Sequence, residues 1–205
     1  MIEWLLFIPA CFALNLAFGP NNLLAMTNGA RSGVVFAQKA ALGRLMVFVP
    51  MIAISALGLG LVLTTSAFVF SIAKVLGAIY LIWLGMSLWR SAKTMTPQGF
   101  SDEEMSLRRA FRSECFVAMS NPKAILIFAA FFPQFVIVDA YWQSYAMLGA
   151  AFLVMEAVAI LGYASFGKVA SHFAFGKLPT LQKASGATMI VFGILLLYSP
   201  QPSRT

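Results

Sequence analysis

The sequence from residue 4 to residue 30 reads WLLFIPACFALNLAFGPNNLLAMTNGA, and no residue in it is charged. About 20 apolar residues suffice for a helix to cross a bilayer, so this run predicts a membrane-spanning helix. Gly19-Pro20-Asn21-Asn22 lies within the run. Because proline removes a backbone donor and clashes with the preceding turn, these residues predict a break inside the span.

The composition of the whole chain agrees with a membrane environment. Of its 205 residues, 60% are hydrophobic and 10% are charged, and the mean hydropathy is +0.86. Soluble domains carry about 25% charged residues, so this chain lacks the polar surface that a water-soluble fold requires. The sequence therefore predicts an all-α polytopic membrane protein.

Further apolar runs predict about six transmembrane helices in a single domain, residues 1–205. After the first span, we expect helices over residues 45–64, 67–89, 115–138, 144–167 and 183–198. A polar stretch, residues 90–114, is the longest connection. It divides the chain into residues 1–89 and 115–205, each with three predicted helices.

The basic residues predict the orientation of the bundle. Most of them fall in the first, third and fifth gaps between predicted helices, whereas the opposite side has only Lys74 and Arg204. Since basic residues favour the cytoplasmic side, both termini are expected on the periplasmic side of a bacterial inner membrane. The residues in these gaps are Arg31, Lys39, Arg44, Arg90, Lys93, Arg108, Arg109, Arg112, Lys168, Lys177 and Lys183.

The two halves of the chain resemble each other. Asn121-Pro122-Lys123 interrupts the fourth predicted helix as Gly19-Pro20 interrupts the first, and Lys74-x-x-Gly-Ala in the third recurs as Lys183-x-x-Gly-Ala in the sixth. An odd number of spans in each unit would insert the second copy upside down. Matched helix breaks in two inverted halves are typical of transporters that bind substrate near the midplane. The plainer interpretation is that both prolines are ordinary kinks of membrane helices.

The broken segments supply the candidate binding residues. A carbonyl left without its helical partner is tolerated at membrane depth only inside protein or beside a watery cavity, and the N-terminus of a half-helix attracts anions such as carboxylates. Asparagine amides add donors and acceptors there. The predicted substrate-binding residues are Gly19, Pro20, Asn21 and Asn22 from the first break and Asn121, Pro122 and Lys123 from the second.

Over nearly its whole length, the chain resembles the lysine-exporter (LysE/RhtB) family of amino-acid exporters. The residues that carry this resemblance are Gly19-Pro20-Asn21-Asn22, Asn28-Gly29-Ala30-Arg31, Gly77-Ala78-Ile79-Tyr80-Leu81, Leu84-Gly85, Asn121-Pro122-Lys123-Ala124 and Phe131-Phe132-Pro133-Gln134-Phe135. The resemblance implies a secondary exporter of small amino acids or their derivatives, driven by proton antiport. The family usually has a further proline before the first Gly-Pro, and here that position is Phe18.

Two ionisable residues lie inside predicted spans. Glu156 is in the middle of the fifth, where a carboxylate is costly unless it is paired, hydrated or protonated, so it is the predicted coupling acid. The alternative is a structural glutamate, protonated or paired with a lysine. Lys123 has three open roles: it binds a substrate carboxylate, pairs with Glu156, or extends its amine to the membrane interface.

Other functions have less support. The sequence has no metal-binding or phosphate-binding motif and no arguable catalytic triad, so we expect neither an enzyme nor a cofactor or metal. The basic residues form no stripe typical of nucleic-acid binding, and membrane lipid is their expected partner. A thiol–disulfide electron carrier of the CcdA/DsbD type, using Cys11 and Cys115, is the alternative function. The sequence leaves open whether the chain forms a homo-oligomer.

Overall fold

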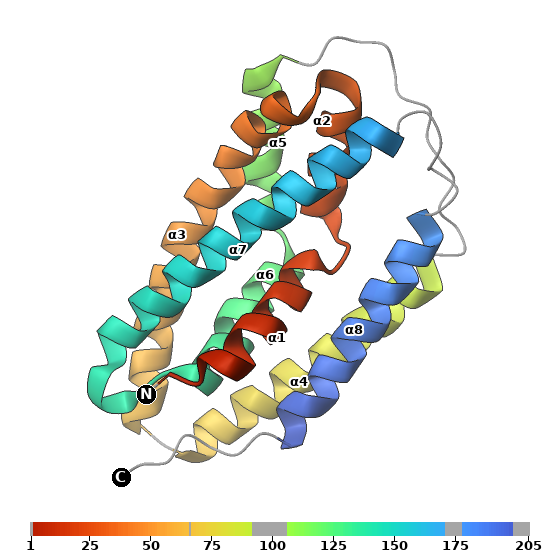
Figure 1. Ribbon diagram of the computed structural model, residues 1–205. Coiled ribbons are helices and arrows are strands. Elements are labelled where there is room, and N and C mark those ends of the chain that lie inside the picture. The colour runs from red at the N-terminus through yellow and green to blue at the C-terminus, as the bar shows by residue number, and fades with distance from the viewer. Residues whose placement is uncertain (1, 66, 92–105, 171–177, 199–205) are drawn as a thin grey trace.

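The fold is known from a computed structural model, which describes residues 2–65, 67–91, 106–170 and 178–198. These residues form an elongated bundle of helices without a β-strand (Figure 1). The elements are α1 (Trp4–Leu16), α2 (Pro20–Ser32), α3 (Val34–Thr65), α4 (Ala67–Ser91), α5 (Leu107–Met119), α6 (Pro122–Leu126), the π-helix η1 (Ile127–Phe131), the 3₁₀-helices η2 (Phe132–Phe135) and η3 (Val138–Ala140), α7 (Tyr141–Ala170) and α8 (Leu178–Tyr198).

The first predicted span is broken where the sequence indicated. Helices α1 and α2 meet at an angle of 62°. Gly19 is the extended residue before α2, and Pro20 follows it at the start of the helix. Proline suits this first position because its missing N–H would have no helical partner there.

The second break lies in the fourth predicted span, between α5 and α6. The segment from Pro122 to Phe135 bends by 47° from α5. The side chain of Asn121 accepts a hydrogen bond from the backbone N–H of Lys123 and so caps α6, and Pro122 begins the helix. The segment then continues as a π-helix, a geometry that appears often at functional sites.

The polytopic, all-helical fold is confirmed, and four of the six predicted spans have direct support. Residues Val34–Gly58 and Val138–Val169 are each long and apolar enough to cross a membrane, and each bent pair qualifies when taken as one span. Helix α4 has 25 residues and helix α8 has 21 residues. Both lengths suffice for a span. Helix α1 begins and α8 ends at the same end of the bundle (Figure 1), as an even number of crossings demands.

Two predicted boundaries were wrong. Helix α3 begins at Val34 and not at Leu45. Gly33 has a φ of 85°, and this conformation, which glycine adopts without strain, lets the chain turn directly after α2. Helix α5 begins at Leu107, within the predicted connection 90–114, where the Ser106 hydroxyl accepts the N–H of Arg109 as a cap. Residues that were expected in loops therefore belong to long helices.

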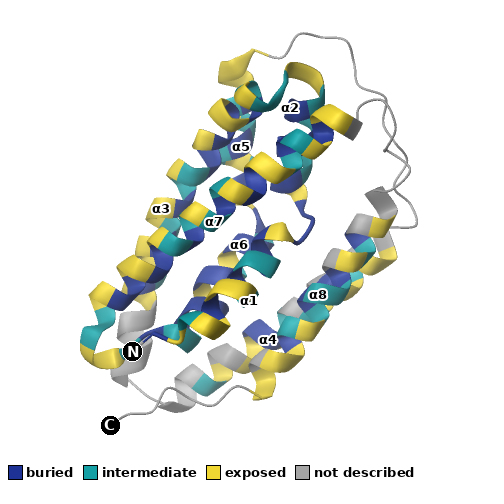
Figure 2. Cartoon of the chain, in the orientation of Figure 1, coloured by how far each residue is buried: buried dark blue, intermediate teal, exposed yellow. Residues whose placement is uncertain are grey.

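Close backbone contacts join the helices in pairs. Carbon atoms added at Gly29 of α2 and at Gly167 of α7 would lie 2.2 and 2.0 Å from a backbone oxygen of the partner helix. Helices α4 and α8 meet in the same way at Gly85 and Gly186. Small residues allow this close approach between membrane helices. The outward faces of the helices carry exposed residues (Figure 2), including the apolar side chains of Leu42, Met46 and Val49 on α3 and Val154, Val158 and Leu161 on α7.

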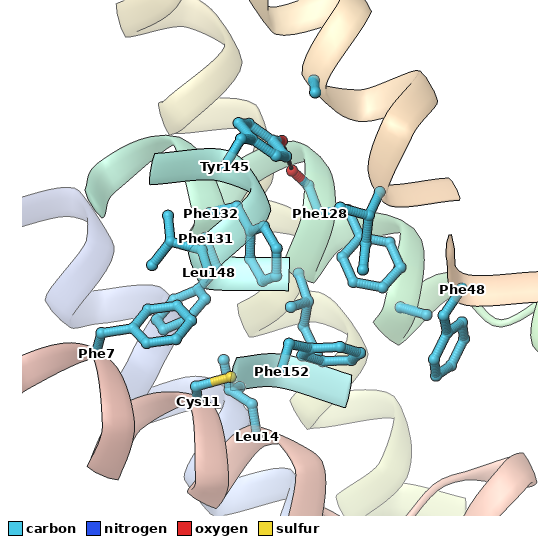
Figure 3. Close-up of a cluster of buried hydrophobic side chains, with 14 of the residues drawn as sticks. Phe7, Cys11, Leu14, Phe48, Phe128, Phe131, Phe132, Tyr145, Leu148 and Phe152 are labelled. Atoms are coloured by element: carbon cyan, nitrogen blue, oxygen red, sulfur yellow. Dashed lines mark hydrogen bonds between the residues drawn. The ribbon is translucent and has the colours of Figure 1, made fainter. Parts of the chain in front are cut away.

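An aromatic cluster fills the part of the bundle nearest the start of α1. It brings together Phe7 of α1, Phe48 of α3, Phe128, Phe131 and Phe132 of η1 and η2, and Tyr145 and Phe152 of α7 (Figure 3). The ring centroids are 5.0 Å apart for Phe128 and Phe152 and 5.5 Å apart for Phe48 and Phe128. Most of its rings meet edge to face, an arrangement that aromatic pairs prefer. The cluster closes this end of the bundle core.

Candidate functional site

Arg44 is the centre of a buried polar cluster between the two helix breaks. Its guanidinium donates from Nε to Glu114 Oε2 (3.0 Å) and from one terminal nitrogen to Glu156 Oε1 (2.7 Å) and Asn22 Oδ1 (3.1 Å). The other terminal nitrogen lies 3.0 Å from Glu114 Oε2 and also donates to the carbonyl of Asn21. One arginine of α3 thus binds α2, α5 and α7.

Two carboxylates share this arginine. The side chain of Glu114 is 0% exposed and that of Glu156 is 4% exposed. A single carboxylate left in such a place without a cation would be strongly destabilising, whereas a well-bonded pair roughly balances its desolvation cost. Arg44 is the ionic partner that both acids share inside the bundle.

Two asparagines connect the two breaks directly, and a third bonds within the first break. Asn121 donates its amide to Asn21 Oδ1 (2.6 Å), and Asn21 donates to Glu114 Oε2 (3.3 Å). Asn22 donates to the carbonyls of Asn15 (2.8 Å) and Ala17 (2.9 Å). The predicted half-sites therefore form one continuous hydrogen-bonded cluster.

Lys123 belongs to the second break but binds the first. Its amine donates to the carbonyls of Leu14 (3.2 Å) and Ala17 (2.9 Å), at the end of α1. Tyr163 of α7 donates in the same region to the carbonyl of Leu16 (2.6 Å). As predicted for a break, carbonyls that lost helical partners take hydrogen bonds from side chains instead.

Some buried polar atoms have no hydrogen-bond partner among the described residues. They include the acceptors Glu114 Oε1 and Asn15 Oδ1 and the donor Asn28 Nδ2. Buried polar groups are nearly always bonded, so such atoms mark positions that a ligand or an ion can satisfy.

The charges of the cluster balance, and the cluster is closed to solvent. Arg44 and Lys123 oppose Glu114 and Glu156, and none of the four residues is more than 7% exposed. Arg44 lies one turn from Phe48 on α3, and Glu156 lies one turn from Phe152 on α7. The aromatic cluster therefore borders the charges on the side of the termini.

The structure brings most predicted site residues together. Asn21, Asn22, Asn121, Lys123 and Glu156 are all in the cluster. Gly19 is buried beside Lys123, since a carbon added there would lie 3.8 Å from the lysine amine. Pro20 and Pro122 start the half-helices but make no polar contact through their rings.

The contacts in the structure do not show two of the roles that were left open for Lys123. Lys123 hydrogen-bonds backbone carbonyls and not Glu156, whose partner is Arg44. Lys123 is also only 7% exposed, so its amine does not extend to the membrane interface.

Sequence reasoning missed Arg44 and Glu114, which were both assigned to loops. A signal for them was present. Arg44 shares one helix face with Ala37, Ala40 and Ala41, and Glu114 shares one with Ala110 and Ala118, all of them buried. A charge at helical spacing among alanines indicates a buried charge that packs against another helix.

The two cysteines lie in different surroundings. Cys11 is buried within the aromatic cluster, where Asn15 donates to its sulfur at 3.7 Å (Figure 3). Cys115 is half-buried beside Gly43 of α3. Both are free thiols, and packing accounts for each of them.

Residues 12–200 match the family model described as LysE type translocator. The chain belongs to this family. Similar curated proteins include a homoserine/homoserine lactone efflux protein of Salmonella typhi, 30% identical over 94% of this chain and 95% of its own length. A leucine efflux protein of Klebsiella pneumoniae is 26% identical over 96% of this chain and 92% of its own length. No solved structure matches the chain.

The family assignment confirms the resemblance that the sequence motifs indicated. The buried cluster of this LysE-type translocator is built from those motifs, Gly19-Pro20-Asn21-Asn22 and Asn121-Pro122-Lys123, together with Arg44, Glu114 and Glu156. Membership in a family of translocators favours transport over catalysis as the role of this cluster.

Proposed function

We propose that this protein exports small amino acids or their derivatives across the bacterial inner membrane in exchange for protons. The observation that carries the proposal is the pair of buried carboxylates, Glu114 and Glu156, that share Arg44 at the junction of two broken helices. Intramembrane acids of this kind are typical of proton pathways, and broken helices at matching places are typical of transport sites.

The names of the relatives suggest the class of cargo. One is named for the efflux of homoserine and homoserine lactone, and another for the efflux of leucine. These molecules share an α-amino group, whereas the lactone has no free carboxylate. We propose a small amino acid or amino-acid derivative with a free amino group as the cargo of this chain.

Glu156 is the proposed coupling acid. Its contact with Arg44 is strongest when the carboxylate is charged, so a proton that reaches Glu156 would weaken the contact and change the packing of α3 against α7. Protonation from one side of the membrane and deprotonation on the other would then alternate two arrangements of the cluster. The two three-helix units would rock against each other around it.

The substrate would bind between the half-sites. Gly19, Pro20, Asn21 and Asn22 form one wall, and Asn121, Pro122 and Lys123 form the other. The amides of the asparagines supply both donors and acceptors, and the ammonium of Lys123 supplies a positive charge. The positive ends of α2 and α6 are the attractive places for an anionic group of the substrate.

The proposed orientation puts both termini in the periplasm. The aromatic cluster, which lies nearest the start of α1, would then close the periplasmic side of the site. Arg108 and Arg112 near the start of α5 are exposed, and they would face the cytoplasmic lipid surface, where basic residues are favoured.

Efflux from proteoliposomes tests the function. Vesicles loaded with radiolabelled homoserine and leucine are compared with and without an imposed pH gradient, for the wild type and for Glu156→Gln. We expect efflux that the gradient accelerates in the wild type, and no acceleration in the variant. Glu3→Gln is the matched control because Glu3 is exposed and lies outside the cluster.

The possible results separate the parts of the proposal. If gradient-driven efflux persists in Glu156→Gln, the proposed export function stands, but Glu156 is not the coupling acid. Absence of efflux from vesicles that contain folded wild-type protein would contradict export of these amino acids.

A further inference from the structure

Only one of the two carboxylate oxygens of Glu114 has hydrogen-bond partners among the described residues. Its Oε2 accepts hydrogen bonds from Arg44 Nε (3.0 Å) and from the amide of Asn21 (3.3 Å), and a terminal nitrogen of Arg44 lies 3.0 Å from it. Its Oε1 has no partner among the described residues, although the side chain is 0% exposed. A buried carboxylate oxygen without a donor is an open binding position.

The reason for the open position lies in how Arg44 is shared. A guanidinium edge normally binds both oxygens of a carboxylate with two parallel hydrogen bonds. Here the edge formed by Nε and a terminal nitrogen reaches a single oxygen of Glu114, while the remaining nitrogen binds Glu156 at 2.7 Å and Asn22 at 3.1 Å. The contacts of this nitrogen fix the position of the guanidinium, and in that position its other edge reaches only one oxygen of Glu114.

We propose that Glu114 Oε1 accepts the ammonium group of the substrate, and that Arg44 makes this binding and a proton on Glu156 mutually exclusive. The inference rests on the proposed function, with Glu156 as the coupling acid. It assigns substrate recognition to Glu114 and the coupling of the two acids to Arg44.

The exchange proceeds through the position of the guanidinium. When Glu156 takes a proton, it loses its negative charge and therefore its ion pair with Arg44. Arg44 then pairs with both oxygens of Glu114, occupies Oε1 and displaces the ammonium. The proton adds one positive charge at Glu156 and the departing ammonium removes one at Glu114, while a zwitterionic substrate also takes its own carboxylate with it.

The direction of this exchange fits export. A proton that enters from the proton-rich outer side would expel the substrate there. Loss of the proton to the cytoplasm would return Arg44 to Glu156 and free Oε1 for the next ammonium. The structure, with Glu156 bound to Arg44 and Oε1 without a partner among the described residues, corresponds to a closed state of this exchange without substrate.

The other titratable groups near Glu114 are engaged elsewhere. Lys123 of α6 binds the carbonyls of Leu14 and Ala17, and Tyr163 of α7 binds the carbonyl of Leu16. Cys11 of α1 accepts from Asn15, and Cys115 follows Glu114 on α5 and lies beside Gly43.

On α2, Glu114 meets the neutral Asn21. Arg44 of α3 and, through it, Glu156 of α7 are therefore the charges that control Glu114.

Equilibrium binding of radiolabelled homoserine and leucine to the purified protein, from mildly acidic to mildly alkaline pH, tests the inference. We expect wild-type binding to weaken as the pH falls. Glu114→Gln should bind at least about 10-fold more weakly throughout, since the ammonium loses its ionic partner. Glu156→Gln should bind weakly at all pH values, and the control Glu3→Gln should match the wild type.

Competition on the wild-type protein gives a second test that needs no variant. Homoserine lactone, which keeps the amino group, should displace the labelled homoserine. N-acetylhomoserine, which keeps the carboxylate but has no ammonium, should not displace it. This result holds even if Glu114→Gln does not fold, which gel filtration would reveal.

Several results would overturn the inference. It would be overturned by wild-type affinity in folded Glu114→Gln, by a normal pH response in Glu156→Gln, or by equal competition from both analogues. In each of these cases, gradient-driven efflux by the wild type would still support the proposed export function. If the wild type neither binds nor exports homoserine or leucine, the proposed function fails and this inference fails with it.

Discussion

The two helix breaks differ in how they are stabilised. The second, between α5 and α6, is closed by its own residues, because the side chain of Asn121 caps the helix that follows it. The first, between α1 and α2, has Gly19 as its cap residue and no side-chain cap. Its carbonyls are bound partly by Asn22 of α2 and partly by Lys123 of α6 and Tyr163 of α7. The second break is thus capped locally, whereas the first also depends on donors from two other helices.

This difference indicates which break moves. A segment whose hydrogen bonds come from other helices changes shape when those helices shift, and a self-capped segment moves as a unit. We therefore expect the first break to change conformation when the helices of the bundle shift. The second break should keep its conformation and move together with Lys123. Four variants, the last a double substitution, test this comparison.

Arg44→Met should have the largest effect because it removes the contact that joins both breaks. Glu114 and Glu156 would be left as buried carboxylates without a cation, at a cost of about 3–5 kcal/mol. We expect low accumulation of folded protein and no transport, measured by thermal unfolding in detergent and by efflux. Arg112→Met, at an exposed position of α5, is the matched control. Normal unfolding of Arg44→Met would contradict the role of Arg44 as the bridge.

Lys123→Met should affect the first break although it lies in the second. The carbonyl of Leu14 loses its side-chain donor, whereas that of Ala17 keeps Asn22. The carbonyl of Leu14 still accepts the N–H of Ala17, so the expected loss is that of the hydrogen bonds from a charged donor, about 1.5–3 kcal/mol. Hydrogen exchange should increase around residues 14–19 and change little in α6. Lys39→Met, which alters an exposed lysine of α3, should leave exchange in both regions unchanged. Faster exchange confined to α6 would reverse the comparison.

Asn121→Ala should affect the second break more than the first. It removes the cap of α6 and the bond to Asn21. Loss of a helix cap costs about 1 kcal/mol, and loss of one hydrogen bond costs about as much again. Hydrogen exchange should rise at the start of α6, and efflux should fall without being lost. An exchange pattern equal to that of Lys123→Met would show that the two breaks are not separate units.

The combined replacement of Cys11 and Cys115 by alanine should have the smallest effect. Each cysteine precedes one break, and each packs against neighbouring residues as a free thiol. We expect a destabilisation on the order of 1 kcal/mol and nearly normal efflux. Complete loss of activity in folded protein would revive the thiol–disulfide alternative.

Local sequence was sufficient for the positions of the breaks but not for the charges between them. Gly19-Pro20 and Asn121-Pro122 interrupt a helix through their own backbone geometry. Their role can therefore be recognised without knowing which residues pack against them. Glu156 was recognisable because it stands alone in an apolar run. Arg44 and Glu114 lie near other charged residues in the sequence, and only the packing of α3 against α5 shows that they face each other. The inverted relation of the two halves and the orientation of the termini remain predictions.

The bond from Lys123 to Leu14 also bears on how the protein is made. Its two partners are 109 residues apart, so the ribosome delivers the end of α1 to the membrane long before its donor exists. During that interval the carbonyl of Leu14 has only its local donor, the N–H of Ala17, and hydrocarbon offers it no further partner. Residues 1–91 alone should therefore insert without reaching their final packing. The first half of the molecule completes its fold only when the second half arrives.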